Sequence, residues 1–287
     1  MKRILMTGGT GQLGRFIATR LKQDGHRLTF LGRTPPEDDS FDFVEWDLAS
    51  STQTVPAADA LIHCALAHAP GQYIGGEGDD PHGFIEKNVD GTQALFTAAK
   101  AAGVRHNVFL SSGAVYSSVE DWAVVKEAYE TTPDTLYGRV KLAGEHALEM
   151  LCDQAMTGSA LRVADVYGLP LGTKFHKWSD LFDAFQNGEK VTPHLGTEVH
   201  GDDLAAALVL ILDQDPAERP NFDVFNVADL LLDRQDVLNS FATGKAISSP
   251  LPARADGPLG VMDAGKLKAL GWSPGGKDKL KEFLGSL

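Results

Sequence analysis

The sequence predicts an α/β fold with a parallel, doubly wound sheet, and two observations lead to this prediction. First, the apolar run at 4–6 is followed by Gly9, Gly11 and Gly14 in a G-x-G-x-x-G spacing, after which a helix-period pattern begins. Second, short apolar runs alternate with amphipathic segments as far as Pro170, which is typical of strand–helix–strand units. The 287 residues allow one large domain or two modest ones.

The glycine-rich stretch indicates a dinucleotide-binding loop. Glycines let the backbone turn sharply and let a pyrophosphate approach the N-terminus of the next helix, where free N–H groups and the helix dipole favour anions. We expect that helix over 12–24, with Gly25 as its left-handed stop. A glycine-rich turn in an ordinary α/β domain is the alternative. The residues expected to contact the dinucleotide here are Gly8, Thr10, Gly11, Gln12, Leu13 and Gly14.

The second strand, expected over 27–31, bears on the type of dinucleotide. A cofactor with a free ribose usually meets an Asp or Glu at the end of this strand. Here Gly32 takes that place and Arg33 follows it. Because a guanidinium can pair with a 2′-phosphate, the sequence favours NADP over NAD, and NAD is kept as the second choice. A solvated arginine in a turn is the alternative for Arg33.

The next strands and helices continue the alternation. Asp47 and Leu48, which follow the third strand, could border the adenine, and the end of the fourth strand offers Cys64, Ala65 and Leu66 as cofactor contacts. The strands are expected over 43–46, 60–65, 107–110 and 159–163, and the helices over 84–102 and 136–150.

Two features of this middle region can each be interpreted in two ways. His63 lies within an apolar strand, so we expect a packed, hydrogen-bonded core histidine and not a ligand. Residues 66–83 are rich in Gly, Pro and Asp and are expected to form a long loop. Long loops without their own structure are often binding loops, and disorder is the alternative.

Beyond Pro170 the alternation ends. Asp202 or Asp203 is expected near a helix start, where carboxylates cap well. Trp178, Phe182 and Phe185 could line a substrate pocket, but their spacing favours an amphipathic core face. We expect a strand over 222–227 and helices over 178–186, 202–212, 230–242 and 264–270, although 235–242 could instead be a packed turn.

Composition narrows the classes of partner. The net charge is −13, with 26 Lys and Arg against 39 Asp and Glu, and no basic run is present, which argues against a nucleic-acid or anionic-membrane partner. The two cysteines, Cys64 and Cys152, suit a protein of a reducing compartment.

With no targeting or membrane-spanning segment visible, a cytoplasmic location is expected. No convincing metal-ligand spacing appears, and acidic residues beside His200 are better explained as caps.

Taken together, the motifs resemble the extended branch of the short-chain dehydrogenase/reductase family, the epimerase/dehydratase-like proteins. The matches cover most of the chain and keep the order and spacing of the family. They are Thr7-Gly8-x-x-Gly11-x-x-Gly14, Asp47-Leu48, Asn88-Val89-x-Gly91-Thr92, Ser111-Ser112-x-x-Val115-Tyr116, Tyr137-x-x-x-Lys141, Leu161-Arg162, Val166-Tyr167-Gly168-x-Pro170, His200-x-Asp202-Asp203-Leu204-Ala205 and Leu270-Gly271-Trp272-x-Pro274.

The resemblance implies a Rossmann-like domain and a small, mainly C-terminal substrate-binding domain. The first is expected to comprise 1–166 together with about 202–227, and the second 167–201 and 228–287. Arg162 and Tyr167 are expected to be structural residues at the domain junction. The helices at 84–102 and 136–150 are those that this family pairs in a dimer interface, so a homodimer is expected by analogy.

The resemblance also implies a catalytic group of Ser112, Tyr137 and Lys141, with Asn88 as a cofactor contact or as a residue that shapes its helix. The alternative is that Asn88 only satisfies backbone groups. Ser112 is preferred over Ser111 because the catalytic Ser or Thr of the family lies three positions before the Val of the Val-Tyr pair. In the family, the lysine that matches Lys141 also binds the ribose of the nicotinamide.

The chemistry of this group follows from the residue types. Tyr137 and Lys141 lie four apart on a helix, so their side chains share one face. A phenol has an ordinary pKa of about 10, and a nearby ammonium and an oxidised nicotinamide would lower the pKa of Tyr137. Tyr137 could then exchange a proton with a substrate hydroxyl while hydride moves to or from the cofactor, and Ser112 would hold the same oxygen.

Three functions remain to be compared. Dehydratases of this branch carry Asp-Glu after the catalytic Thr, whereas Gly113 and Ala114 cannot move protons, so a dehydratase is excluded. The first hypothesis is an NADP-dependent reductase or dehydrogenase of a small carbonyl or hydroxyl compound, including sugar-derived ones, because Arg33 suits NADP and the chain is short for a nucleotide-sugar enzyme. The first alternative is a nucleotide-sugar epimerase with tightly held NAD. The second is a non-catalytic NADP-sensing protein, against which the intact catalytic group argues.

Overall fold

A seven-stranded, all-parallel sheet forms the centre of the protein. The computed structural model describes residues 1–50, 54–69, 76–116, 119, 122–243, 245, 247, 249–256 and 260–287. The strand order is β10-β7-β5-β4-β1-β2-β3, which confirms the expected doubly wound sheet. The strands are β1 Arg3–Thr7, β2 Arg27–Gly32, β3 Asp42–Glu45, β4 Ala60–His63, β5 His106–Ser112, β7 Thr157–Val163 and β10 Phe222–Val227.

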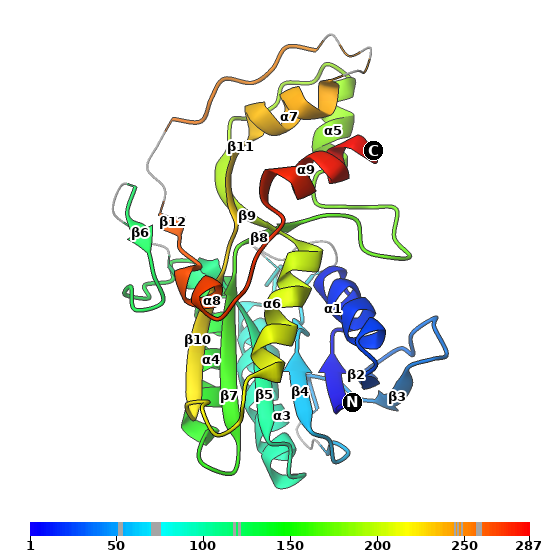
Figure 1. The fold of residues 1–287 in the computed structure, drawn as a ribbon, viewed down its shortest axis with the longest axis vertical. Helices are drawn as coiled ribbons and strands as arrows, with labels where there is room; N and C mark the ends of the chain where they lie inside the picture. The colour runs from blue at the N-terminus through cyan, green and yellow to red at the C-terminus, as the bar shows by residue number, and fades with distance from the viewer. Residues whose placement is uncertain are drawn as a thin grey trace.

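Helices cover both faces of this sheet because successive strand residues point to opposite sides. Ile4 and Met6 of β1 pack in the same core cluster as Ile17 of α1 (Gln12–Gln23) and Leu208 of α6 (Gly201–Asp213). Leu5, between them, belongs to a second cluster that includes buried residues of α3 (Gly91–Ala101) and α4 (Leu136–Leu151). Figure 1 shows α1 and α6 in front of the sheet and α3 and α4 behind it.

The helix predicted over 84–102 is in fact three joined segments. It begins with α2 (Pro81–Ile85), where the Asp80 side chain accepts the Gly83 N–H, continues through a π-helical turn at Glu86–Asp90, and becomes α3. Inside the wide turn, Asn88 Nδ2 donates to the Phe84 carbonyl at 2.8 Å. A side-chain donor therefore occupies a carbonyl that a regular helix would use itself, and the helix widens at this point.

A second, three-stranded sheet of order β11-β9-β8 forms the smaller part of the protein, above the main sheet in Figure 1. Its strands are β8 Asp165–Tyr167, β9 Leu195–His200 and β11 Leu230–Asp233. Three helices pack there, α5 (Ser179–Gln186), α7 (Arg234–Ala242) and α9 (Gly276–Gly285). Trp178, Phe182 and Phe185 lie in the core cluster of this part together with Tyr167, so the core-face prediction for them is confirmed.

Several sequence predictions for the second half need correction. Residues 230–233, expected to be helical, form β11 because they pair antiparallel with β9. Asp202 and Asp203 lie in the first turn of α6, as expected, but the side-chain cap is His200, whose Nδ1 accepts the Asp202 N–H. The strand β9 and the helix α9 were not predicted at all.

The remaining short elements join the two parts. A parallel two-stranded ladder pairs β6 (Val124–Val125) with β12 (Val261–Met262), and α8 (Gly265–Ala269) follows β12. Ala264 and Leu267 pack in the core cluster of the main sheet, although 228–287 was assigned to the small domain. The domain boundaries drawn from the sequence stay a prediction.

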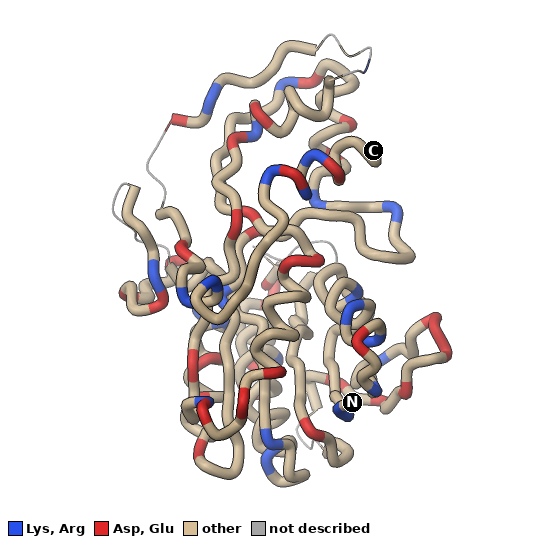
Figure 2. The backbone as a smooth tube through the Cα atoms, viewed as in Figure 1, with Lys and Arg blue, Asp and Glu red and all other residues tan. Residues whose placement is uncertain are grey.

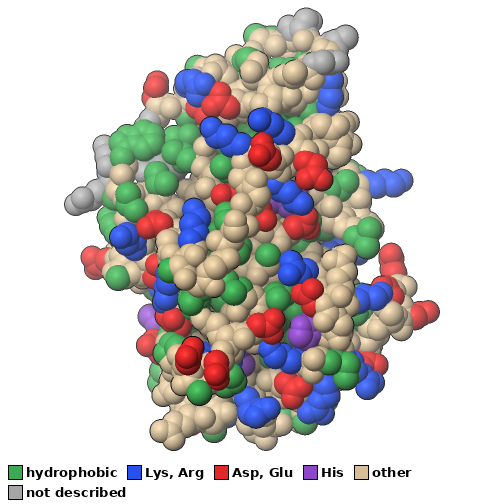
Figure 3. All heavy atoms as spheres, in the orientation of Figure 1, with side chains coloured by type: hydrophobic (Ala, Val, Ile, Leu, Met, Phe, Trp, Pro, Cys, Tyr) green, Lys and Arg blue, Asp and Glu red, His purple; other side chains and the backbone are tan. Residues whose placement is uncertain are grey.

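Charged side chains of both signs are distributed over the chain. Figure 2 shows Asp and Glu along the whole backbone with Lys and Arg among them, and the face in Figure 3 carries acidic and basic groups interspersed. That face therefore presents no extended field of one sign. Among the helices of the described residues, none has both the length and the apolarity that a bilayer crossing demands.

Candidate active-site cleft

A cleft of about 1320 Å³ opens at the carboxyl ends of the parallel strands. In the main sheet β1 lies between β2 and β4, so β2 and β3 extend the sheet on one side of β1 and β4, β5, β7 and β10 extend it on the other. Open α/β sheets bind ligands at such a switch point. The cleft is lined by residues that follow β1, β2, β3 and β4, and also by the ends of β5 and β7 and the start of α4. One opening thus joins the glycine loop to the proposed catalytic group.

The glycine loop is packed so closely that side chains are excluded from it. Gly8 has φ +67°, and a Cβ there would lie 2.8 Å from the Ala65 nitrogen. A Cβ at Gly14 would lie 2.1 Å from the Gly8 carbonyl oxygen. Gly11, at the N-cap of α1, has no described side chain hydrogen-bonded over it. The first N–H groups of α1 are therefore presented to the cleft, which suits a pyrophosphate.

The ends of β2 and β3 line the opposite part of the cleft. Arg33 is exposed there and makes no ion pair with a described residue, which fits both the 2′-phosphate contact and the solvated arginine, so both stay predictions. Asp47 also lines the cleft, and its Oδ1 accepts the Ala49 N–H at 2.9 Å. Leu48 lines the cleft while its carbonyl packs on α3, where a Cβ at Gly91 would lie 2.0 Å from it.

The end of β4 is fixed by a buried hydrogen-bonded chain. His63 Nδ1 lies 2.6 Å from Thr7 Oγ1 and His63 Nε2 lies 2.9 Å from Thr92 Oγ1. Thr7 Oγ1 in turn accepts the Ala65 N–H at 3.2 Å. Burial lowers the pKa of His63 to about 3, so the ring is neutral and structural, and the expectation of a core histidine is confirmed. These hydrogen bonds hold Cys64, Ala65 and Leu66 at the cleft wall.

Asn88 is the one proposed cofactor contact that is not found among the described residues lining the cleft. Its Oδ1 accepts the Ala67 N–H at 2.8 Å, and its Nδ2 donates to the carbonyls of Ala67 and Phe84. The side chain is 4% exposed. Asn88 therefore satisfies backbone groups of the loop after β4 and of the wide turn before α3, and its contact with a cofactor stays a prediction.

Ser112, Tyr137 and Lys141 all reach the cleft. Ser112 ends β5, and its Oγ accepts the Ala114 N–H at 3.1 Å. The start of α4, capped by Thr135, approaches this turn very closely, because a Cβ at Gly138 would lie 2.3 Å from the Ala114 carbonyl oxygen. That contact places the start of α4, which carries Tyr137, against the turn that follows Ser112.

Lys141 lies deeper, one helical turn after Tyr137. Its ammonium donates to the Leu110 carbonyl at 2.7 Å and lies 5.8 Å from the centre of the Tyr137 ring. Burial lowers the pKa of Lys141 to about 8, against the opposing influence of Cys64 and Glu145. Burial also raises the pKa of the Cys64 thiol to about 12, so that thiol is neither charged nor nucleophilic near neutral pH.

The far end of the cleft carries a charged group that the sequence analysis did not single out. Lys177 Nζ lies 2.7 Å from Asp165 Oδ2 and 2.5 Å from Glu198 Oε1, and Lys177 and Asp165 line the cleft. Burial raises the pKa of Glu198 to about 7. Asp165 comes two residues after Val163, the register partner of Ser112, so its place at a strand end was a usable signal. Glu198 lies on β9, which the sequence did not predict.

No group of three or more His, Cys, Asp or Glu side chains in the described part of the chain is arranged to hold a metal ion. The acidic residues near His200 serve other contacts. Asp203 Oδ2 accepts the Gly275 N–H at 3.1 Å, and Asp202 pairs with Lys279 at 2.9 Å.

Comparison with known proteins gives matches along most of the chain. The model of the NAD dependent epimerase/dehydratase family matches residues 4–228. An uncharacterized protein of Sinorhizobium fredii is 29% identical over 292 residues, covering 96% of this chain and 68% of that protein. A UDP-glucose 4-epimerase of Corynebacterium glutamicum is 25% identical, covering 95% of this chain and 91% of its own length. The match to a UDP-glucose 4-epimerase of Streptomyces lividans is 30% identical and spans 51% of this chain and 46% of that enzyme, so about half of that relative is covered.

Among solved structures, MoeE5 in complex with UDP-glucuronic acid and NAD superposes with a TM-score of 0.80. The two chains are 24% identical, and the superposition covers 99% of this chain and 96% of MoeE5. This likeness confirms the Rossmann-like fold, including the small upper part.

Proposed function

The chain belongs to the NAD dependent epimerase/dehydratase family, and from this premise we propose that it is a nucleotide-sugar epimerase that uses NAD. The observation that carries the proposal is the single cleft in which the glycine loop and the group of Ser112, Tyr137 and Lys141 face the same space. The relatives named UDP-glucose 4-epimerase support the substrate class and favour the epimerase alternative over the NADP-dependent reductase expected first from the sequence. The NAD held by MoeE5 supports the choice of cofactor.

The residues present fit a dinucleotide. The glycine loop leaves a cradle that any Cβ at Gly8 or Gly14 would fill, and the uncapped start of α1 offers N–H groups to a pyrophosphate. Asp47 and Leu48 would border the adenosine half, and Tyr137 and Lys141 the nicotinamide half. The bound NAD would supply a hydride acceptor, and then a hydride donor, for one carbon of the sugar.

Ser112 and Tyr137 would act on the oxygen of that carbon. Tyr137 would take the hydroxyl proton as the carbon is oxidised to a ketone, and return it to the same oxygen when the ketone is reduced on its opposite face. Because Ser112 Oγ already accepts the Ala114 N–H, its own proton is left to donate to the substrate oxygen. The result is inversion at one carbon with no net oxidation or reduction.

Lys141 would make the proton transfer possible near neutral pH. An ammonium close to the phenol stabilises the phenolate that forms when Tyr137 has given up its proton. The ammonium is held in place by its bond to the Leu110 carbonyl, so little reorganisation is needed during the reaction.

A dehydratase reaction is not supported by the site. Elimination of water needs a further acid and base after the catalytic Ser or Thr, and Gly113 and Ala114 provide neither.

One observation favours a second candidate, the NADP-dependent reductase of a small carbonyl compound. Arg33 is exposed at the cleft where a 2′-phosphate would lie, and the end of β2 offers no carboxylate to a free ribose. The non-catalytic NADP sensor is the weakest candidate, because Ser112, Tyr137 and Lys141 are intact and line one cleft.

An assay with UDP-galactose separates these candidates. The epimerase proposal expects conversion to UDP-glucose, seen by chromatography, with no net change in reduced-nicotinamide absorbance and with NAD released from the purified protein on denaturation. Consumption of NADPH with a small carbonyl substrate, and no sugar conversion, would support the reductase instead.

A further inference from the structure

The inward side of α4 carries a third polar residue in line with Tyr137 and Lys141. Glu145 follows Lys141 by four residues, so the three side chains occupy successive turns of one side of the helix. Glu145 is 2% exposed, which is rare for a carboxyl group unless it is paired. It does not line the main cleft, so it does not contact substrate there.

The Glu145 carboxyl group is held by two partners from two strands. Ser111 Oγ of β5 donates to Oε1. Arg162 of β7 donates through Nη2 to Oε2 at 2.7 Å, and through Nε to Oε1 and Oε2 at 3.1 and 3.2 Å. The side chains of this ion pair are 2% and 7% exposed, so its geometry is fixed by several charge-assisted hydrogen bonds away from water.

These contacts clamp α4 to β5 at two neighbouring points. The Leu110 carbonyl accepts Lys141 Nζ, and Ser111, the next residue, donates to Glu145 one helical turn further on. Ser112 follows and faces the cleft. Because two points on the helix are tied to two successive strand residues, α4 can neither rotate nor slide without breaking a buried contact. The position of Tyr137 relative to Ser112 is set by the same clamp.

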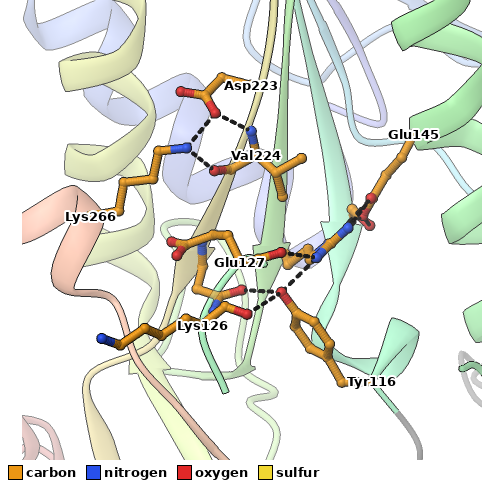
Figure 4. Close-up of polar contacts among 10 residues, drawn as sticks. Tyr116, Lys126, Glu127, Glu145, Asp223, Val224 and Lys266 are labelled. Atoms are coloured by element: carbon orange, nitrogen blue, oxygen red, sulfur yellow. Dashed lines mark hydrogen bonds and ion pairs between the residues drawn. The ribbon is translucent and has the colours of Figure 1, made fainter. Parts of the chain in front are cut away.

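Arg162 is anchored on its far side as well. Its Nη1 donates to the Tyr116 hydroxyl at 2.6 Å and to the Glu127 carbonyl at 3.0 Å. The Tyr116 hydroxyl donates to Asn226 Oδ1 of β10 at 3.0 Å. Figure 4 shows this chain of contacts running from Glu145 across to Tyr116 and the carbonyl of Glu127. The arginine that holds Glu145 is therefore itself immobilised.

Glu145 is also the charged neighbour of Lys141. The two groups that raise the pKa of Lys141 against its burial are Cys64 and Glu145. The Cys64 thiol is uncharged at the pH where Lys141 titrates, because burial raises its pKa to about 12. The anion that stabilises the ammonium is thus Glu145.

We propose that Glu145 is a positioning residue for the reaction. Together with Ser111 and Arg162 it fixes α4 on β5 and so sets where Tyr137 lies at the cleft, and its carboxylate is the anion one helical turn from the Lys141 ammonium. The inference rests on Tyr137 and Lys141 being the reacting pair and not on the identity of the sugar.

The direct test is the pH dependence of acetylation of Lys141 by acetic anhydride in the cofactor-free protein, followed by mass spectrometry. Glu145→Gln keeps the shape and removes the charge, and it should lower the apparent pKa of Lys141 by about one unit. Glu149→Gln, an exposed position one turn further on, is the matched control and should leave the value unchanged. An unchanged value in Glu145→Gln would overturn the electrostatic part of the proposal.

The geometric part is tested by two variants that keep the Glu145 charge. Ser111→Ala and Glu145→Asp should each lower kcat several-fold, with KM and the acetylation profile close to wild type. Equal kcat in all these proteins would overturn the positioning role. If Glu145→Gln does not fold, the acetylation experiment compares the double variant Glu145→Gln/Arg162→Met with Arg162→Met, because these two proteins differ only in the Glu145 charge. Acetylation needs no substrate, so its outcome is separate from success or failure of the epimerase proposal.

Discussion

The Lys141 ammonium lies 5.8 Å from the centre of the Tyr137 ring and donates to the Leu110 carbonyl at 2.7 Å. The cation is thereby attached to the central sheet and not to mobile side chains, while the phenol above it reaches the cleft. This relationship makes the proton-transfer ability of the site depend on the protonation of one buried lysine.

Activity should therefore fall as the pH rises through the pKa of Lys141. Burial lowers that pKa to about 8, so the ammonium is present below this pH and is lost above it. The measurement is the pH profile of kcat/KM, in which the alkaline limb is expected near pH 8. A limb near 10.5, the value of a solvated lysine, would show that Lys141 does not control the reaction.

Gly14→Ala should abolish tight dinucleotide binding. The new Cβ would lie 2.1 Å from the Gly8 carbonyl oxygen, so the loop must move away from the start of α1. Overpacking of this kind costs about 1–3 kcal/mol of stability. Gly285→Ala, where a Cβ meets nothing within 4 Å, is the control. Calorimetric titration with NAD measures the effect, and wild-type affinity in Gly14→Ala would contradict the assigned pyrophosphate site.

Arg33→Ala decides between the two dinucleotides. Under the NAD proposal, wild type prefers NAD over NADP, and Arg33→Ala leaves NAD affinity within about twofold, because an exposed side chain contributes little there. Fluorescence titration with NADH and NADPH gives both constants, and Arg20→Ala on the outer side of α1 serves as the control. An NADPH preference in wild type that disappears in Arg33→Ala would favour the reductase candidate.

Glu198 makes stability depend on pH. Its folded-state pKa of about 7 is raised from 4.5, so its contribution to stability is fully present below about 4.5 and is lost as the pH rises through 7. Burial outweighs the nearby Lys177 ammonium, and the shift corresponds to a loss of roughly 3 kcal/mol. The Tm of Glu198→Gln relative to wild type should therefore be higher at pH 8 than at pH 5. Glu189→Gln, at an exposed position, should show no such dependence.

Much of the main sheet and its site could be predicted from the sequence. The parallel strands are buried on both faces, so they appear as short apolar runs such as 4–6, and glycines with positive φ such as Gly25 and Gly103 end the helices between them. Of the proposed cofactor and catalytic residues, all but Asn88 line the cleft. Carboxyl ends of parallel strands meet at one edge, which is why motifs far apart in the chain converge.

The small upper part was harder to predict because its patterns are mixed. The strand β9 includes Thr197, Glu198 and His200, and the last two are buried polar residues that break its apolar run. The apolar residues of β11 stand directly before α7, so the sequence pattern predicts a single helix over both. The helix α9 begins at Gly276 with charged residues, which hide its amphipathic face.

The contacts of Glu145 could not be predicted from the sequence either. Its partners Ser111 and Arg162 lie 34 and 17 residues away, and a charged pair at such separations leaves no periodic signal. The pairing of Ser111 with Arg162 in register between β5 and β7 is what brings them together, and it becomes visible only in the folded sheet.

The central claim is that one cleft removes a hydride from a sugar carbon and returns it to that carbon, with Tyr137 carrying the proton. The most direct measurement uses UDP-galactose deuterated at C4 and follows the product by NMR. The account predicts UDP-glucose with deuterium retained at C4 for wild type and for Tyr129→Phe, and at least about a hundredfold slower conversion for Tyr137→Phe. Replacement of the deuterium by solvent hydrogen, or unchanged conversion by Tyr137→Phe, would contradict it.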